Sequence, residues 1–292
     1  MNDVEVTCIL PCAAQLGEGA VWSVRDQVLW WVDIRAPSLH RFDPATGHDR
    51  EWAMPESVGC LALGPTDRVL VGLASGLAWF DPVAEWLEHD VRIEADVPTS
   101  RLNDGRCDRQ GQLWVGSMNR GGAGGHGSLY RCEAGGQPCR MLTGIEVPNT
   151  TAFSPDGRTM YFADSPSRRI RAFDLDPVTG EISGERIFAT IENGVPDGAT
   201  VDAEGGLWVA CWDGWRVARF LPDGKLDREI AMPVPRPTCC AFGGPDLATL
   251  YVTSARTGLD AVMLDRAHLS GGVFALHPGV CGLAEPIFGK PP

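Results

Sequence analysis

A short strand-forming run returns along this chain at a nearly constant spacing. The six runs are VLWWVDI (28–34), RVLVGLA (68–74), QLWVGSM (112–118), TMYFADS (159–165), GLWVACW (206–212) and TLYVTSA (249–255). Their central residues, Trp30, Leu70, Trp114, Tyr161, Trp208 and Tyr251, are 40, 44, 47, 47 and 43 residues apart. A repeat of about 40–45 residues that holds about four strands is typical of a β-propeller blade.

Each run is followed by a second strand-like segment, which strengthens the prediction of a repeated sheet. These segments are LHRFD (39–43), LAWFD (77–81), SLYRC (128–132), IRAFD (170–174), VARFL (217–221) and GVFAL (272–276). Six units fill the chain from about residue 14 to residue 280. We therefore predict an all-β fold, a six-bladed β-propeller that forms a single domain over residues 1–292.

The ends of the chain are predicted to close the ring. VEVTCIL (4–10) and EPIF (285–288) have strand character, and we expect them to complete the last blade, because closure removes exposed sheet edges. The one helix expected is short and lies around AVMLDRAHL (261–269). The 35 Gly and 22 Pro residues agree with a turn-rich β protein rather than a helix bundle.

Charge and cysteine content restrict the partners and the compartment. With 38 acidic and 25 basic residues the formal charge is −13, which disfavours binding to nucleic acid or to an anionic membrane. The N-terminal segment lacks the pattern of a signal peptide, and no apolar run is long enough to span a bilayer. We expect a cytoplasmic protein with ten reduced cysteines, present as a monomer or a small homo-oligomer.

Four polar residues keep the phase of the repeat. Glu18 precedes Trp30 by 12 residues, Asn103 precedes Trp114 by 11, Asn149 precedes Tyr161 by 12, and Asp197 precedes Trp208 by 11. Equivalent positions at the start of the innermost strands surround the central channel of a propeller. The four side chains are therefore predicted to converge, although they are far apart in the sequence.

Two carboxylates and two amides form a set of hard oxygen ligands. Such a set suits Ca²⁺, Mg²⁺ or Mn²⁺, with Zn²⁺ and Fe²⁺ as alternatives, and few protein ligands leave positions open for water and substrate. The alternative is that these residues only cap turns, as Asp104 and Asp197 in their Asp-Gly pairs could do. Four residues in phase, one of them a Glu that is a poor turn residue, favour the metal site.

The same segments resemble the senescence marker protein/gluconolactonase (regucalcin-like) family. The similarity runs from LGEGAVWS through RLNDGRCD, PNTTAFSPDG and PDGATVDAEGGLWVACW to CCAFGGPDLATLYVTSARTG. It implies a six-bladed propeller, one divalent cation and hydrolysis of aldonolactones. It also implies that Glu18, Asn149 and Asp197 bind the metal, that Arg101 and Asn103 bind substrate, and that Asp197 is the general base.

The chain departs from the family pattern after Met118. Asn119, Arg120 and a glycine-rich loop (121–125) follow, where some relatives carry acidic residues. Because this loop would face the substrate, Asn119 and Arg120 are added to the predicted substrate-binding residues. Arg120 would favour a substrate with an extra anionic group; the alternative is a solvated arginine on a surface loop.

The predicted chemistry is attack of water on a lactone carbonyl. A metal would polarise the carbonyl, and either Asp197 or the metal alone would activate the water. The chain has no GxSxG or HExxH motif, and the GxGxxG match at 122–127 precedes a strand rather than a helix. Two other functions stay open: a non-catalytic calcium-binding or interaction propeller, and a metal-dependent esterase or organophosphate hydrolase.

Overall fold

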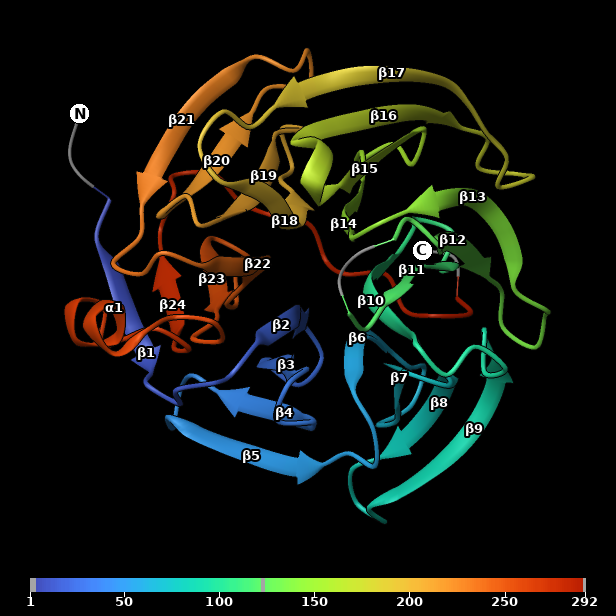
Figure 1. The fold of residues 1–292 in the computed structure, drawn as a ribbon, viewed down its shortest axis with the longest axis horizontal. Helices are drawn as coiled ribbons and strands as arrows, with labels where there is room; N and C mark the ends of the chain where they lie inside the picture. Colours follow the sequence, from blue (N-terminus) through green and yellow to red (C-terminus); the bar gives the residue numbers. More distant parts are fainter. Residues whose placement is uncertain (1–3, 122–123, 291–292) are drawn as a thin grey trace.

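Six four-stranded antiparallel sheets stand around a central channel (Figure 1). This computed structural model describes residues 4–121 and 124–290. In five sheets the strands follow one another in chain order from the channel outward. The predicted six-bladed β-propeller is confirmed.

The strands agree with the predicted repeat. The first three blades contain β2 (Gly17–Ser23), β3 (Val28–Asp33), β4 (Ser38–Asp43) and β5 (His48–Ala53); β6 (Val58–Leu63), β7 (Val69–Leu73), β8 (Gly76–Asp81) and β9 (Trp86–Arg92); and β10 (Ser100–Cys107), β11 (Leu113–Asn119), β12 (Gly127–Cys132) and β13 (Cys139–Ile145). The next two contain β14 (Pro148–Phe153), β15 (Thr159–Asp164), β16 (Arg169–Leu175) and β17 (Ile182–Thr190); and β18 (Val195–Val201), β19 (Leu207–Trp212), β20 (Arg216–Phe220) and β21 (Leu226–Ala231).

The last blade closes the ring with a strand from the N-terminus. It consists of β22 (Pro237–Gly243), β23 (Thr249–Ser254), β24 (Val273–Leu276) and, as its outermost strand, β1 (Val6–Leu10). The prediction that residues 4–10 complete this blade is confirmed. Pairing of the first strand with the last sheet ties the two ends of the ring together.

The prediction for residues 285–288 is wrong. This segment does not join the last blade, because the outer edge of that blade is already occupied by β1. It crosses the channel instead: Ile287 forms a single parallel bridge with Leu63, and the Phe288 amide donates to the Leu63 carbonyl at 2.9 Å. In Figure 1 the red C-terminal segment passes the inner strands and ends beside β11.

Burial explains why the inner strands are continuously apolar. Every residue of β2, β3 and β14 is buried, because both faces of an inner strand pack against neighbouring blades. The outer strand β5 is mostly exposed. Trp30, Trp114 and Trp208 are at most 3% exposed, as expected for aromatic residues of the core. Trp114 meets Phe153 of the next blade with ring centroids 6.0 Å apart.

The 3-10 turn η1 (Ser165–Ser167) and the helix α1 (Ala261–Arg266) complete the secondary structure of the described chain. The helix lies within the predicted range 261–269, and the Asp260 side chain caps its N-terminus by accepting from the Met263 amide at 2.8 Å. Over residues 4–121 and 124–290, no helix has the length and apolar character required to cross a membrane.

Candidate functional site

The four in-phase residues line one cavity at one end of the channel. Glu18 lies near the start of β2, Asn103 in β10, Asn149 in β14 and Asp197 in β18, each on the innermost strand of its blade. Together with Arg101 they line a cavity of about 310 Å³. This volume is at the lower end of the range for small-molecule sites and suits a monosaccharide-sized ligand.

A local irregularity occurs in each of these four strands at the site residue. The pairing register shifts between Glu18 and Val21, between Leu102 and Gly105, between Asn149 and Ala152, and between Pro196 and Ala199. Such bulges turn side chains away from the regular alternation of a strand. They therefore allow the polar side chains to face the cavity while the rest of each strand stays in the apolar core.

Thr150 carries backbone strain beside the site. Its φ is +58°, a left-handed conformation that is uncommon for a β-branched residue. Thr150 is fully buried, and its hydroxyl donates to the Asp197 carbonyl at 2.6 Å. The bond ties β14 to β18, so that Asn149 and Asp197 are held in a fixed relation. The equivalent residue in β2 is Gly19, which adopts a φ of +59° without such strain.

The two other inner strands, β6 and β22, place no free polar side chain at the equivalent position. A Cβ at Gly59 in β6 would lie 2.5 Å from the Leu102 carbonyl oxygen, so that only glycine fits there. In β22 the Thr238 hydroxyl hydrogen-bonds to the Gly17 carbonyl and to the Thr253 hydroxyl. Four of the six blades therefore supply a polar residue to the site from this position.

A chain of hydrogen bonds orients the two amides. Arg101 Nη1 donates to Asn103 Oδ1 at 2.7 Å, and Asn103 Nδ2 donates to Asn149 Oδ1 at 3.2 Å. Asn149 Nδ2 in turn donates to Ser165 Oγ at 2.9 Å, and the Ser165 hydroxyl donates to the Pro196 carbonyl at 2.6 Å. Because the Ser165 hydroxyl donates its hydrogen to the Pro196 carbonyl, its oxygen can only accept from the Asn149 side chain. The Asn149 NH₂ group must therefore face Ser165, and Asn149 Oδ1 faces Asn103.

Glu18 and Asp197 form a buried carboxyl pair. They are 7% and 5% exposed, and each carboxyl group affects the pKa of the other. Burial raises the pKa of Glu18 to about 8, with a further contribution from the negative charge of Asp104. Burial is also the main reason that the pKa of Asp197 lies well above its ordinary range. The negative charge of Glu18 is the second cause. The positive charge of Arg101 lowers the pKa of Glu18, but by less than burial and Asp104 raise it.

The donor set fits a divalent cation. Two carboxylates that resist ionisation in the folded chain would be stabilised by a nearby double positive charge, and Asn149 Oδ1 keeps a second lone pair. Across the described residues no metal-binding group with three or more His, Cys, Asp or Glu side chains occurs. Any metal here would therefore depend on two carboxylates with amide oxygens as further ligands, a combination that suits hard cations.

Arg35 and Arg120 lie near Arg101, which lines the cavity. Arg35, in the turn between β3 and β4, lines the cavity, and Arg120 follows β11. Burial, together with the positive charges of Arg35 and Arg120, lowers the pKa of Arg101 to about 10. Both residues are therefore close enough to Arg101 for electrostatic repulsion.

The structure separates the predicted substrate-binding residues into two groups. Arg101 and Asn103 line the cavity. Asn119 and Arg120 lie beside it, since Asn119 pairs with Ser100 in the β10–β11 ladder and the Arg120 amide donates to the Thr99 carbonyl at 2.7 Å. Within the glycine-rich loop 121–125, residues 122 and 123 are outside the described residues. The roles assigned to all these residues stay predictions.

Several residues of the site were not found from the sequence. Arg35, Ser165 and Trp212 line the cavity, and they come from a β3–β4 turn, from η1 and from the end of β19. None of them occupies the position that repeats in the inner strands. A search for polar residues just after the second strand of each blade would have found Arg35 and Ser165.

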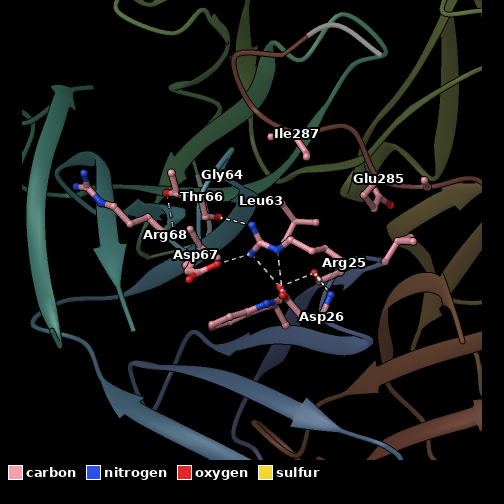
Figure 2. Close-up of a pocket in the computed structure, with 14 residues that line it drawn as sticks. Arg25, Asp26, Leu63, Gly64, Thr66, Asp67, Arg68, Glu285 and Ile287 are labelled. Carbon is pink, nitrogen blue, oxygen red and sulfur yellow. Dashed lines mark hydrogen bonds and ion pairs between the residues drawn. The ribbon is translucent and has the colours of Figure 1, made fainter. Parts of the chain in front are cut away.

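A second cavity lies at the other end of β2, beside Ser23, and its charges are already paired. It measures about 160 Å³. Figure 2 shows Arg25 joined to Asp26 and Asp67, at distances of 2.9 Å and 3.2 Å. Arg68 at its edge pairs with Glu88 at 2.6 Å. Because these charges neutralise one another, this cavity lacks the unpaired groups of the first.

Comparison with known families gives a match over most of the chain. Residues 16–256 match the family described as SMP-30/Gluconolactonase/LRE-like region. The matched range contains every residue that lines the 310 Å³ cavity except Thr257.

Individual relatives cover nearly the full length of the chain. The 6-deoxy-6-sulfogluconolactonase of Pseudomonas putida is 39% identical over 292 residues, 99% of both chains. The L-arabinolactonase of Azospirillum brasilense is 41% identical over 296 residues, 99% of this chain and 97% of the relative. The crystal structure of regucalcin from Agrobacterium tumefaciens, described as a calcium-binding protein, has a TM-score of 0.94 at 34% identity and covers 98% of each chain.

Proposed function

The chain belongs to the SMP-30/gluconolactonase/LRE-like family, and on that premise we propose that it hydrolyses a sugar lactone to the aldonic acid. The observation that carries the proposal is the joint placement of Glu18, Asn103, Asn149, Asp197 and Arg101 in one cavity. The names of two relatives, both lactonases, support the same reaction class.

We propose that Glu18, Asn149 and Asp197 hold one divalent cation, with Asn103 close to it. Ca²⁺, Mn²⁺, Mg²⁺, Zn²⁺ and Fe²⁺ are all candidates for an oxygen-rich site. A bound cation would supply Lewis acidity toward the lactone carbonyl. Ser165 would act as a positioning residue, because it fixes the orientation of the Asn149 amide.

In the proposed reaction, water attacks the carbonyl carbon of the lactone. A new C–O bond forms, the ring C–O bond of the ester breaks, and the released ring oxygen takes up a proton to become a hydroxyl group. Asp197 accepts the proton of the attacking water, a contribution typically of about 10²–10⁴-fold. Arg101 would orient the sugar, since its guanidinium is held by Asn103 Oδ1 and the Leu102 carbonyl.

The test is acid release from a panel of aldono-1,4- and aldono-1,5-lactones. Protein stripped with a chelator is assayed alone and after addition of each candidate cation, and the Glu18→Ala variant is compared with Glu181→Ala, an exposed glutamate outside the cavity. We expect turnover that requires metal, disappears in Glu18→Ala and persists in Glu181→Ala. Metal binding without turnover of any lactone would overturn the proposal and favour a non-catalytic calcium-binding propeller.

A further inference from the structure

The mouth of the cavity carries positive charge without an acidic partner. Arg35 is exposed at the rim, and its guanidinium makes no hydrogen bond or ion pair with the described residues. Its backbone is nevertheless fixed, because the Asp33 carboxylate accepts from the Arg35 amide at 2.9 Å and from the Leu16 amide at 3.0 Å. Arg35 is thus held at the cavity with its charged end available.

Arg120 is anchored beside the same opening. Its Nε donates to the Ser100 carbonyl at 3.0 Å, so that its guanidinium keeps other donors for a ligand. The described residues contain no carboxylate that pairs with it. Its proximity to Arg101 brings three guanidinium groups together, although the chain as a whole has a charge of −13.

The positive charges of the three arginines are not balanced by acidic residues of the cavity. Glu18 and Asp197 are the acidic residues that line the cavity. In the proposed function a divalent cation neutralises both of them, and a neutral lactone would add no negative charge. Three arginines in and beside the cavity would then repel one another, a cost that an anionic group on the substrate would remove.

The depth of the charged groups indicates where that anion would lie. Glu18 and Asp197 are buried at the base of the cavity, whereas Arg35, which lines it, and Arg120, which lies beside it, are exposed. A lactone whose carbonyl reaches the base would direct the opposite end of its carbon chain to the rim. A group on the terminal carbon would therefore meet the arginines.

We propose that the substrate is an aldonolactone with an oxyanion group on its terminal carbon, and that Arg35 and Arg120 bind this group. The proposal rests on the proposed lactonase function. Sulfonate, phosphate and carboxylate groups share the required chemistry, since arginine binds each of them through charge-assisted hydrogen bonds.

The first experiment compares a neutral lactone with its anionic counterparts. The kcat/KM of metal-loaded enzyme is measured for glucono-1,5-lactone and for the same lactone with a sulfonate, a phosphate or a carboxylate at the terminal carbon. We expect at least one anionic lactone to exceed the neutral one by about 10- to 100-fold. The group with the highest value identifies the oxyanion, and the preference should shrink as ionic strength rises.

Variants then assign the preference to residues. Arg35→Ala and Arg120→Ala should each reduce the anionic-to-neutral ratio of kcat/KM by about tenfold. Arg92→Ala, which removes an exposed arginine of β9 away from the cavity, should leave the ratio unchanged. Equal or better turnover of the neutral lactone would overturn the inference but leave the lactonase proposal intact. Absence of turnover with every lactone would overturn the lactonase proposal itself.

Discussion

The two ends of the inner strand β18 carry aspartates in opposite situations. Asp202, just beyond the strand, is fully buried and accepts hydrogen bonds from Arg219 Nε and Trp208 Nε1, both at 2.8 Å. Asp197 lies at the cavity end. Burial raises its pKa, and the negative charge of Glu18 adds to this effect. One carboxylate is fully compensated by donors of the chain, and the other is not.

Strand β10 also has polar residues toward both of its ends. Asn103 faces the cavity, whereas Asp108, just beyond the other end, accepts from Trp114 Nε1 and from the amides of Gln110 and Gln112, all at 2.9 Å. Buried charges that stabilise a fold have their partners in place, while buried charges that await a ligand do not. The comparison separates the structural end of the channel from the proposed catalytic end.

The sharpest way to break this comparison is Asp197→Asn. We expect turnover to fall by about 10²–10⁴-fold, because an amide cannot accept a proton from water. The free energy of unfolding should stay constant or rise, since a buried carboxyl without a cation is removed. The measurement is kcat at saturating metal, with metal content determined in parallel. Near-normal turnover with metal bound would contradict the role of Asp197.

The raised pKa of Glu18 predicts how pH acts on the metal-free protein. The folded chain retains the Glu18 proton up to about pH 8, whereas the unfolded chain releases it near the ordinary value of 4.5. The folded state therefore binds more protons in this window, and stability falls as pH rises from 5 to 8, by a few kcal/mol at most. The Glu18→Gln variant has no carboxyl group at this position, so its stability lacks this dependence on pH.

This effect is measured as the difference in unfolding free energy between the chelated wild-type protein and Glu18→Gln. The difference should shift in favour of the variant as pH rises from 5 to 8. A shift in the opposite direction would show that Glu18 ionises more readily in the folded state than in the unfolded one. Added divalent metal should cancel the loss in the wild-type protein only.

Asp202→Asn makes the matching change at the structural end. It removes the negative partner of Arg219, which is 3% exposed and keeps Asp227 at 3.0 Å. We expect a loss of about 2–3 kcal/mol in the free energy of unfolding, measured with urea, because a charged hydrogen bond is weakened. The kcat/KM of the folded variant should be unchanged. A variant that lost activity but kept full stability would contradict the assignment of Asp202 as structural and Asp197 as catalytic.

Ser165→Ala gives the smallest expected effect. Without the Ser165 hydroxyl, Asn149 Nδ2 loses its acceptor and the amide is no longer held in one orientation. Loss of such a supporting contact typically weakens metal binding by about 10- to 100-fold. Isothermal titration with Mn²⁺ measures it, and Ser167→Ala, an exposed serine of the same turn, is the control. Equal affinities in the two variants would contradict a positioning role.

The repeated part of the site could be predicted from the sequence, and the rest could not. The same place in four of the six repeats is occupied by Glu18, Asn103, Asn149 and Asp197. Their spacing was therefore enough to predict that they lie together at one end of the channel. Ser165 and Arg35 lie on connections that differ between blades. The strain at Thr150 depends on the bulge in β14, which no local pattern indicates.

The path of the C-terminal segment was also beyond sequence reasoning. EPIF has the composition of a strand, but β1 occupies the edge that it was expected to take. Its position is decided by contacts across the channel: Glu285 pairs with the buried Arg106, and Phe288 packs against Trp79 with ring centroids 5.8 Å apart. Such contacts appear only when all six blades are in place.

The most direct test of the account is the binding of Mn²⁺ to chelator-treated protein. Titration of the wild-type chain, Glu18→Gln and Glu181→Gln gives the number of ions bound and their affinity. The account predicts one tightly bound ion in the wild-type chain and in Glu181→Gln, and at least a tenfold weaker affinity in Glu18→Gln. Equal affinity in all three proteins, or no binding by the wild-type chain, would contradict the claim that the unpaired carboxyl pair is a metal site.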